Sequence, residues 1–141
     1  MKFMRFSVGN PRGELVELPT EHGSRMEEIE AFVGGMSSDS YLVKGYALVT
    51  NDKGYELGLP VSMLAVTNRN TIEILGNFYI YKYDDFTRQT IDMTEEDVKY
   101  FRDRLLVINS TPTLYLQDGY NKQAFIVMAQ MQGFTCEELK D

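Results

Sequence analysis

Two strands joined by a turn are predicted from the stretch Thr71-Ile72-Glu73-Ile74-Leu75-Gly76-Asn77-Phe78-Tyr79-Ile80-Tyr81-Lys82-Tyr83. Both halves are rich in β-branched and aromatic residues, which favour strands. Gly76 and Asn77 between them tolerate the backbone angles of a tight turn. We therefore expect 71–75 and 77–83 to form a strand pair, and the fold to contain β-sheet.

Further strands with turn sequences between them are predicted on both sides of this stretch. Asn10-Pro11-Arg12-Gly13 separates the first two, and Asn51-Asp52-Lys53-Gly54 separates the next two. Both segments have the residues that hairpin turns favour. The predicted strands outside the central stretch cover residues 2–8, 14–18, 41–50, 55–59 and 114–116.

The helix predicted after Thr94, the second along the chain, has the clearest pattern of the predicted helices. Thr94 and Asp97 have the spacing of a capping box, which marks a helix start. Val98, Phe101 and Leu105 then recur on one face of the helix, opposite a charged face. The pattern predicts that Phe101 and Leu105 lie in the core.

A first and a third helix are also predicted. Ser24 and Glu27 have capping-box spacing, and Gly34-Gly35 ends the helix that follows. In residues 121–132, the central positions are apolar on nearly all sides of a helix, which favours a buried helix. One arm of a hairpin turning at Asp118-Gly119 remains the alternative for this segment.

Together these elements predict an α+β fold, with a mainly antiparallel sheet and two or three helices in a single domain. A chain of 141 residues buries roughly two-thirds of its unfolded surface on folding, which is enough for a core without disulfides or metal. No repeat, low-complexity tract or linker interrupts the chain. We therefore predict one domain over residues 1–141.

Charge and cysteine content narrow the functional classes. The formal net charge is −7 at pH 7, whereas proteins that bind duplex nucleic acid carry a concentrated basic face, so we expect no direct duplex binding. Cys136 is the only cysteine, which fits a reducing compartment. The N-terminal residues alternate between apolar and polar, which predicts neither a signal peptide nor a membrane span. We expect a cytoplasmic protein without a membrane partner.

Groups that catalyse reactions or bind metal are scarce. His22 is the only histidine, whereas a zinc site needs several histidine or cysteine ligands at chelating spacing. The carboxylates of 95–97 lie in a helix first turn, where the helix dipole attracts acids. We therefore predict no catalytic residue, no metal site and no cofactor.

The tyrosines of the central stretch are the best candidate for a binding site. Strand periodicity sends Tyr79, Tyr81 and Tyr83 to one face, and tyrosine offers a flat ring for stacking. Arg69 and Arg88 flank this strand in sequence and suit a phosphate or an acidic partner. The alternative is a sheet face that another element covers.

Several short motifs occur in a recognisable order and spacing. They are ALVTNDKG at 47–54, LGLP at 57–60, ILGNF at 74–78, Asp85-Phe86, and TEED at 94–97. With these motifs, residues 12–105 resemble an uncharacterised domain family of small phage and bacterial proteins, and residues 106–141 form a C-terminal extension. The resemblance implies a phage, prophage or mobile-element protein in a bacterial host cell, and implies no activity.

We therefore expect a non-catalytic binding protein of phage or mobile-element origin. It would capture a host protein or a small ligand and so counter a bacterial defence. The alternative is a nucleotide-binding sponge or a nucleotide-processing enzyme, with tyrosines on the base and arginines on the phosphates. A homo-oligomer formed through an exposed strand edge is also left open.

Overall fold

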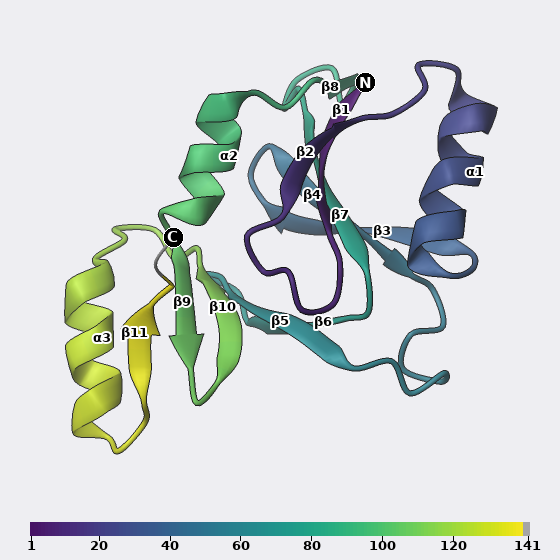
Figure 1. Ribbon diagram of the computed structural model, residues 1–141. Helices are drawn as coiled ribbons and strands as arrows, with labels where there is room; N and C mark the ends of the chain where they lie inside the picture. Colours follow the sequence, from purple (N-terminus) through teal and green to yellow (C-terminus); the bar gives the residue numbers. More distant parts are fainter. Residues whose placement is uncertain (140–141) are drawn as a thin grey trace.

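Two β-sheets lie at the centre of the computed structural model, which describes residues 1–139 (Figure 1). Sheet A consists of β1 (Lys2–Phe6), β2 (Glu14–Glu17), β3 (Ser37–Val43), β4 (Tyr46–Asn51), β7 (Phe78–Tyr83) and β8 (Thr90–Ile91). Sheet B consists of β5 (Val61–Val66), β6 (Thr71–Leu75), β9 (Leu105–Ile108), β10 (Thr111–Tyr115) and β11 (Cys136–Glu138). The helices are α1 (His22–Val33), α2 (Glu95–Arg102) and α3 (Lys122–Met131).

The order of the strands shows how the sheets are assembled. Sheet A has the order β2-β1-β7-β4-β3, with β8 beside β7, and sheet B has the order β11-β9-β10-β5-β6. Within residues 1–139, β10 and β5 are the one parallel pair, and all other neighbours are antiparallel. The predicted α+β class with mainly antiparallel strands is therefore confirmed, although the strands form two sheets.

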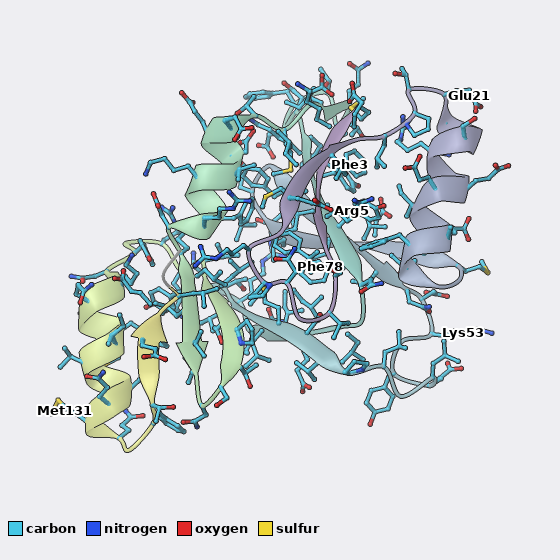
Figure 2. The ribbon with its side chains drawn as sticks, in the orientation of Figure 1. Phe3, Arg5, Glu21, Lys53, Phe78 and Met131 are labelled. Atoms are coloured by element: carbon cyan, nitrogen blue, oxygen red, sulfur yellow. The ribbon has the colours of Figure 1, made fainter. Side chains whose placement is uncertain are left out.

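Alternation along the strands of sheet A divides their side chains between two cores. Met4, Phe6 and Phe78 face sheet B in the main core, and the rings of Phe6 and Phe78 stack with centroids 4.6 Å apart. Phe3 and Tyr79 face the opposite way and pack beneath α1. Figure 2 shows where Phe3 and Phe78 lie on their strands. Consecutive strand residues point to opposite faces, so Phe78 and Tyr79 stabilise different layers.

Two asparagine side chains hold the C-terminal end of α1 on sheet A. Asn51 Nδ2 donates to the Val33 carbonyl oxygen at 3.0 Å, and Asn77 Nδ2 donates to that of Phe32 at 3.1 Å. The last carbonyl groups of a helix have no partner within it, so these amides satisfy them. Gly34 then ends the helix with φ 88°, a left-handed conformation that glycine adopts without strain. Both asparagines belong to the sequence motifs, so these motif residues stabilise the fold.

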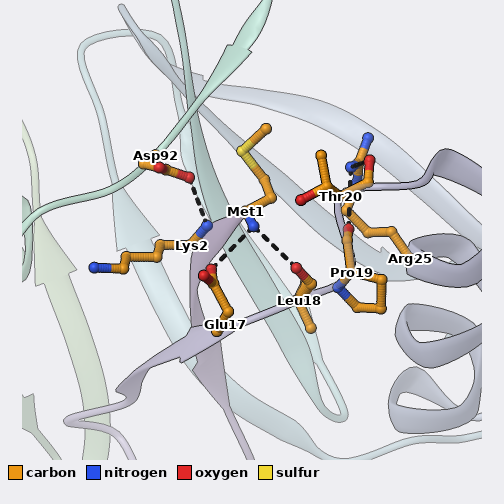
Figure 3. A network of polar contacts seen from close by, with 8 residues as sticks. All are labelled: Met1, Lys2, Glu17, Leu18, Pro19, Thr20, Arg25 and Asp92. Atoms are coloured by element: carbon orange, nitrogen blue, oxygen red, sulfur yellow. Dashed lines mark hydrogen bonds and ion pairs between the residues drawn. The ribbon is translucent and has the colours of Figure 1, made fainter.

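Polar contacts also fix the chain where it enters α1 (Figure 3). Arg25, in the first turn of α1, donates to the Thr20 carbonyl oxygen at 2.9 Å. The Met1 nitrogen donates to the Leu18 carbonyl oxygen at 2.9 Å, which ties β1 to the segment that leads into α1. The helix is thus attached to sheet A at both ends.

The N-cap of α1 is Glu21, and the prediction that Ser24 caps this helix is wrong. The Glu21 carboxylate accepts hydrogen bonds from the N–H groups of Gly23 and Ser24 at 2.9 and 2.6 Å. Hydrogen bonds from the Ser24 side chain and backbone lower the pKa of Glu21 to about 2. A carboxylate in this position satisfies the same free N–H groups that a serine cap would satisfy.

The segment 37–60 differs most from its prediction. The predicted strand 41–50 is a hairpin of β3 and β4, turned at Lys44-Gly45, where Gly45 has φ 89°. The predicted strand 55–59 is a turn, because its N–H groups bond locally, with Leu57 donating to the Lys53 carbonyl oxygen at 2.9 Å. The next strand is β5, which the sequence pattern did not reveal.

Both predicted strands of the stretch 71–83 exist, but they do not pair with each other. β6 pairs with β5 in sheet B, whereas β7 lies between β1 and β4 in sheet A. The chain crosses between the sheets at Gly76, where a Cβ atom would lie 2.9 Å from the Leu59 side chain. A glycine at the crossing leaves room for Leu59.

The two later helices agree with the sequence pattern. α2 begins after the Thr94 cap with its capping box formed, and Phe101 is 1% exposed. Leu105 is buried as predicted, but it is the first residue of β9, because α2 ends at Arg102. Residues 122–131 form α3, so the hairpin alternative is wrong. The short strands β8, β9 and β11 were not predicted.

Candidate ligand-binding cleft

Tyr79, the first of the three predicted tyrosines, lies inside the protein. Its exposed fraction is 0%, and its ring meets those of Phe3 and Phe32 at centroid distances of 6.1 and 5.1 Å. Phe32 belongs to α1, so the alternative expectation, that another element covers the sheet face, holds for Tyr79. A partner cannot reach this ring while α1 is in place.

Tyr79→Phe is expected to leave the free energy of unfolding unchanged or to raise it by about 1 kcal/mol. The Tyr79 hydroxyl is buried and forms no hydrogen bond of normal geometry among the described residues. Burial raises its pKa, and the charge of Arg5 and a looser side-chain contact with Arg5 act in the opposite direction. Urea titration measures the change. The matched control is Tyr81→Phe, which removes a hydroxyl that donates to Asp39 at 2.7 Å and should cost about 0.5 to 1.5 kcal/mol. A larger loss for Tyr79→Phe than for the control would show that its hydroxyl is bonded.

Tyr81, Tyr83 and Arg88 lie together toward the far end of β7. Both tyrosines are half-buried, and the Arg88 Cζ atom is 5.6 Å from the centroid of the Tyr83 ring. The hollow beside Tyr81 has a volume of about 80 Å³. Small-molecule sites usually measure roughly 300 to 1,000 Å³. Binding through these three residues stays a prediction, and the shape suits a protein contact better than a small ligand.

Arg69 lies apart from the tyrosine strand, in the turn between β5 and β6. Its Cζ atom is 4.5 Å from the centroid of the Tyr41 ring on β3. The five predicted residues therefore do not form one site, because Arg88 accompanies Tyr83 while Arg69 belongs to a different region.

A cleft of about 370 Å³ opens beside the Arg69–Tyr41 pair, where β3 of sheet A meets the β5–β6 turn of sheet B. Leu42 and Leu116 line it from the main core. The polar and aromatic lining residues are Tyr41, Lys44, Thr67, Asn68, Arg69, Tyr100 and Asp118. The volume falls within the range of roughly 300 to 1,000 Å³ that is usual for small-molecule sites.

Cationic side chains gather around this cleft, although the whole chain carries a net charge of −7. The Lys44 side chain is 81% exposed and lies 3.6 Å from Asp85, an exposed pair of little strength. Arg69 forms no ion pair with a carboxylate of residues 1–139. Arg104 adds positive charge next to the lining residue Tyr100, with its Cζ atom 3.8 Å from the Tyr100 ring centroid. An anion that enters therefore meets Arg69 without displacing a carboxylate.

Hydrogen bonds hold the turn that carries Arg69. Thr67 Oγ1 accepts from the N–H groups of Arg69 and Asn70 at 3.2 and 3.3 Å. Asn68 Oδ1 accepts from the Asp118 N–H at 2.8 Å, and the Asn68 amide donates to the Asp118 carboxylate. These bonds join two separate segments of the wall, so the cleft is formed before any ligand arrives.

The lining provides binding groups and lacks a catalytic pair. It contains no histidine or cysteine among the described residues, and its one carboxylate, Asp118, is bonded to Asn68. Over residues 1–139, no cluster of three or more His, Cys, Asp and Glu side chains is placed to hold a metal ion. Nucleophilic catalysis requires a nucleophile beside a base, and the lining offers neither in such an arrangement.

Sequence reasoning missed Tyr41, Lys44 and Tyr100 as site residues. Tyr41 was assigned to the start of a long strand at 41–50, whereas it lies within the edge strand β3 and is 45% exposed. Tyr100 belongs to α2, far along the chain. No local pattern links these residues, because only the packing of the two sheets brings them together.

Comparison with known proteins gives one match. A family model described as a domain of unknown function (DUF3846) matches residues 1–106. The match begins earlier than the expected range of 12–105 and includes all of β1. No curated protein and no solved structure matches the chain. In the described residues, no helix has the length and apolar character needed to cross a membrane.

Proposed function

The chain belongs to the DUF3846 family, and we propose that it is a non-catalytic binding protein that captures a small anionic ligand in the cleft beside Arg69. The observation that carries this proposal is the Arg69–Tyr41 pair at a preformed cleft, where the guanidinium has no carboxylate partner among residues 1–139. Guanidinium groups bind carboxylates and phosphates through paired hydrogen bonds. Capture of a ligand is favoured over its conversion, because no catalytic pair occurs among the described residues that line the cleft.

We assign this activity to the cytoplasm of a bacterial host, in a protein of phage or mobile-element origin. There, removing a small signalling ligand would counter a bacterial defence. The support for this setting is the resemblance of the motifs over 47–97 to small phage and bacterial proteins. Binding of an anion at the cleft does not depend on this setting.

A second candidate function is capture of a host protein through the β7–β8 turn. Phe86 in this turn is 94% exposed, and Arg88 lies over Tyr83 beside it. An exposed aromatic residue next to an arginine and a tyrosine is typical of interface hot spots. Retention of a bacterial protein from host lysate by the wild type, and its loss with Phe86→Ala, would favour this second function.

The proposed function predicts that small anions stabilise the protein through Arg69. Thermal melts at low ionic strength, with phosphate, pyrophosphate, citrate and nucleoside monophosphates, measure this. An anion present at 100 times its Kd should add about 2.7 kcal/mol of stability. Arg69→Ala should reduce the affinity at least tenfold. The control is Arg88→Ala, which removes an arginine from a tyrosine ring outside the cleft and should leave binding unchanged.

Two outcomes would contradict the proposal. One is a set of melts in which no anion raises the Tm. The other is equal loss of the stabilisation in Arg69→Ala and Arg88→Ala, which would mean that the anions bind to surface charge in general.

A further inference from the structure

Tyr41 offers an aromatic face at the mouth of the cleft. It lies on edge strand β3, is 45% exposed, and has the Arg69 guanidinium 4.5 Å from its ring centroid. At an exposed site such a contact between a cation and a ring is weak. A charge-assisted hydrogen bond from a guanidinium to a phosphate is stronger. A phosphate would therefore draw Arg69 away and free the Tyr41 ring for stacking.

The charges around the cleft favour a ligand with an anionic group at one end and hydrogen-bond donors at the other. Lys44 and Arg69 supply positive charge, whereas Asp118 supplies a carboxylate. Asn68 donates to that carboxylate, and an ionised carboxylate has further lone pairs that can accept from a ligand N–H. Asp118 would weaken the binding of a ligand that is anionic throughout. A ligand with a phosphate and an N–H-bearing ring would satisfy both sets of groups.

The size of the cleft limits the ligand to a small molecule. Its volume of about 370 Å³ lies near the lower end of the roughly 300 to 1,000 Å³ found for small-molecule sites. This is the scale of one nucleotide. A longer nucleic acid would have to continue over a surface whose net charge is −7, which opposes binding.

We infer that the ligand of the cleft is a mononucleotide, with Arg69 and Lys44 on its phosphate and Tyr41 stacked on its base. This inference rests on the proposed function, because it names the ligand of the same cleft. Stacking on a tyrosine tolerates every base, since each base has a flat π face. The cleft therefore selects the class of ligand through the combination of base and phosphate.

Isothermal titration calorimetry with the full chain tests the inference. The probes are the four ribonucleoside monophosphates, the four matching nucleosides, and ribose 5-phosphate, which has the phosphate without a base. At least one monophosphate should bind tenfold or more tightly than both its nucleoside and ribose 5-phosphate. Tyr41→Ala should weaken the binding of that monophosphate at least fivefold and leave the affinity for ribose 5-phosphate unchanged. Arg69→Ala should weaken the binding of both the monophosphate and ribose 5-phosphate.

Matched variants separate stacking from general damage to the fold. Tyr41→Phe keeps the ring and should keep the affinity for the monophosphate. Tyr83→Ala removes the tyrosine of the other arginine–tyrosine pair and should change no affinity. Circular dichroism confirms that each variant is folded before titration.

The outcomes distinguish the inference from the proposal beneath it. Equal affinity for monophosphates and ribose 5-phosphate, or unchanged affinity in Tyr41→Ala, would overturn the nucleotide inference and leave anion capture intact. Binding of pyrophosphate or citrate through Arg69, with no binding of any monophosphate, would do the same. If no anion binds, or if Arg69→Ala changes nothing, both are overturned.

Discussion

Replacing Phe101 with alanine is expected to lower the free energy of unfolding by about 3 to 5 kcal/mol. The Phe101 side chain is 1% exposed and holds α2 against the main core. Its ring meets those of Tyr46 and Tyr100 edge-on, at centroid distances of 4.9 and 5.0 Å. Truncation removes these contacts and leaves a cavity that rigid strands on both sides cannot fill. Guanidinium chloride titration of the two proteins measures the difference.

The matched control is Phe86→Ala. The Phe86 side chain is 94% exposed, so the same truncation should change stability by no more than about 0.5 kcal/mol. If Phe101→Ala costs less than about 1 kcal/mol, α2 does not pack on the core as described here. A similar loss in both variants would point to an effect on the unfolded chain instead.

Two elements whose sequence signal and contacts lie within one short segment were predicted well. The cap of α2 needs only Thr94 and Asp97, three residues apart, and its buried face follows from helical spacing. The β1–β2 hairpin likewise forms around its own turn, with Met4 opposite Leu15. In both cases the sequence signal and the physical contact involve the same short segment.

Strand pairing could not be predicted in the same way. Residues 71–75 and 78–83 are strands, but composition does not say which sheet a strand joins. The chain passes from one sheet to the other at Gly76, close to the Leu59 side chain, and this contact is not visible in the local sequence pattern. The hairpin at Lys44-Gly45 was missed because apolar and aromatic residues continue on both sides of it, as in one long strand.

The candidate site shows the same limit. Strand periodicity correctly puts Tyr79 and Tyr81 on one face, since both pack with the residues beneath α1. It cannot show that α1 covers Tyr79 completely while leaving Tyr81 half-exposed. The cleft could not be predicted from the sequence for a stronger reason. Tyr41, Arg69 and Tyr100 come from three elements that only tertiary packing brings together.

The cleft also combines two parts of the chain that differ in their relation to the family. Tyr41, Arg69 and Tyr100 lie within the matched residues 1–106, whereas Leu116 and Asp118 lie beyond them. Asn68 joins the two parts through its bonds to Asp118. The cationic and aromatic groups therefore belong to the family domain, and the carboxylate comes from the segment that follows it.

Asp97 is the second position where one substitution should have a large effect. Its oxygens accept hydrogen bonds from the Tyr46 hydroxyl and from the Thr94 N–H at 2.7 Å, and Lys82 Nζ lies 3.1 Å away. Burial and the adjacent carboxylate raise the pKa of Tyr46, so its hydroxyl stays protonated and donates. Asp97→Asn replaces an acceptor oxygen with a donor and removes the charge. It should lower the free energy of unfolding at pH 7 by about 1.5 to 3 kcal/mol.

The pH dependence of this difference tests the charge itself. Burial raises the pKa of Asp97, but the hydrogen bonds from Tyr46, Thr94 and Lys82 outweigh burial and hold it below the ordinary value of 3.8. A carboxylate with a lowered pKa stabilises the folded state fully above its unfolded pKa, and this contribution is lost as the pH falls through the folded pKa. Urea titrations of wild type and Asp97→Asn should therefore differ by a constant amount above pH 3.8 and converge in stronger acid.

The exposed pair of Lys99 in α2 and Asp103 at its C-terminal cap supplies the control. Their charged atoms are 2.5 Å apart, but the Asp103 side chain is 52% exposed, so Asp103→Asn should cost only about 0.3 to 0.5 kcal/mol. A difference for Asp97→Asn that is equally small at pH 7 would mean that its partners bond to water instead. A difference that grows on acidification would mean that Asp97 is protonated more readily in the folded protein than in the unfolded chain. Convergence in acid is the result expected if the buried carboxylate, held by Tyr46 and Lys82, attaches α2 to sheet A.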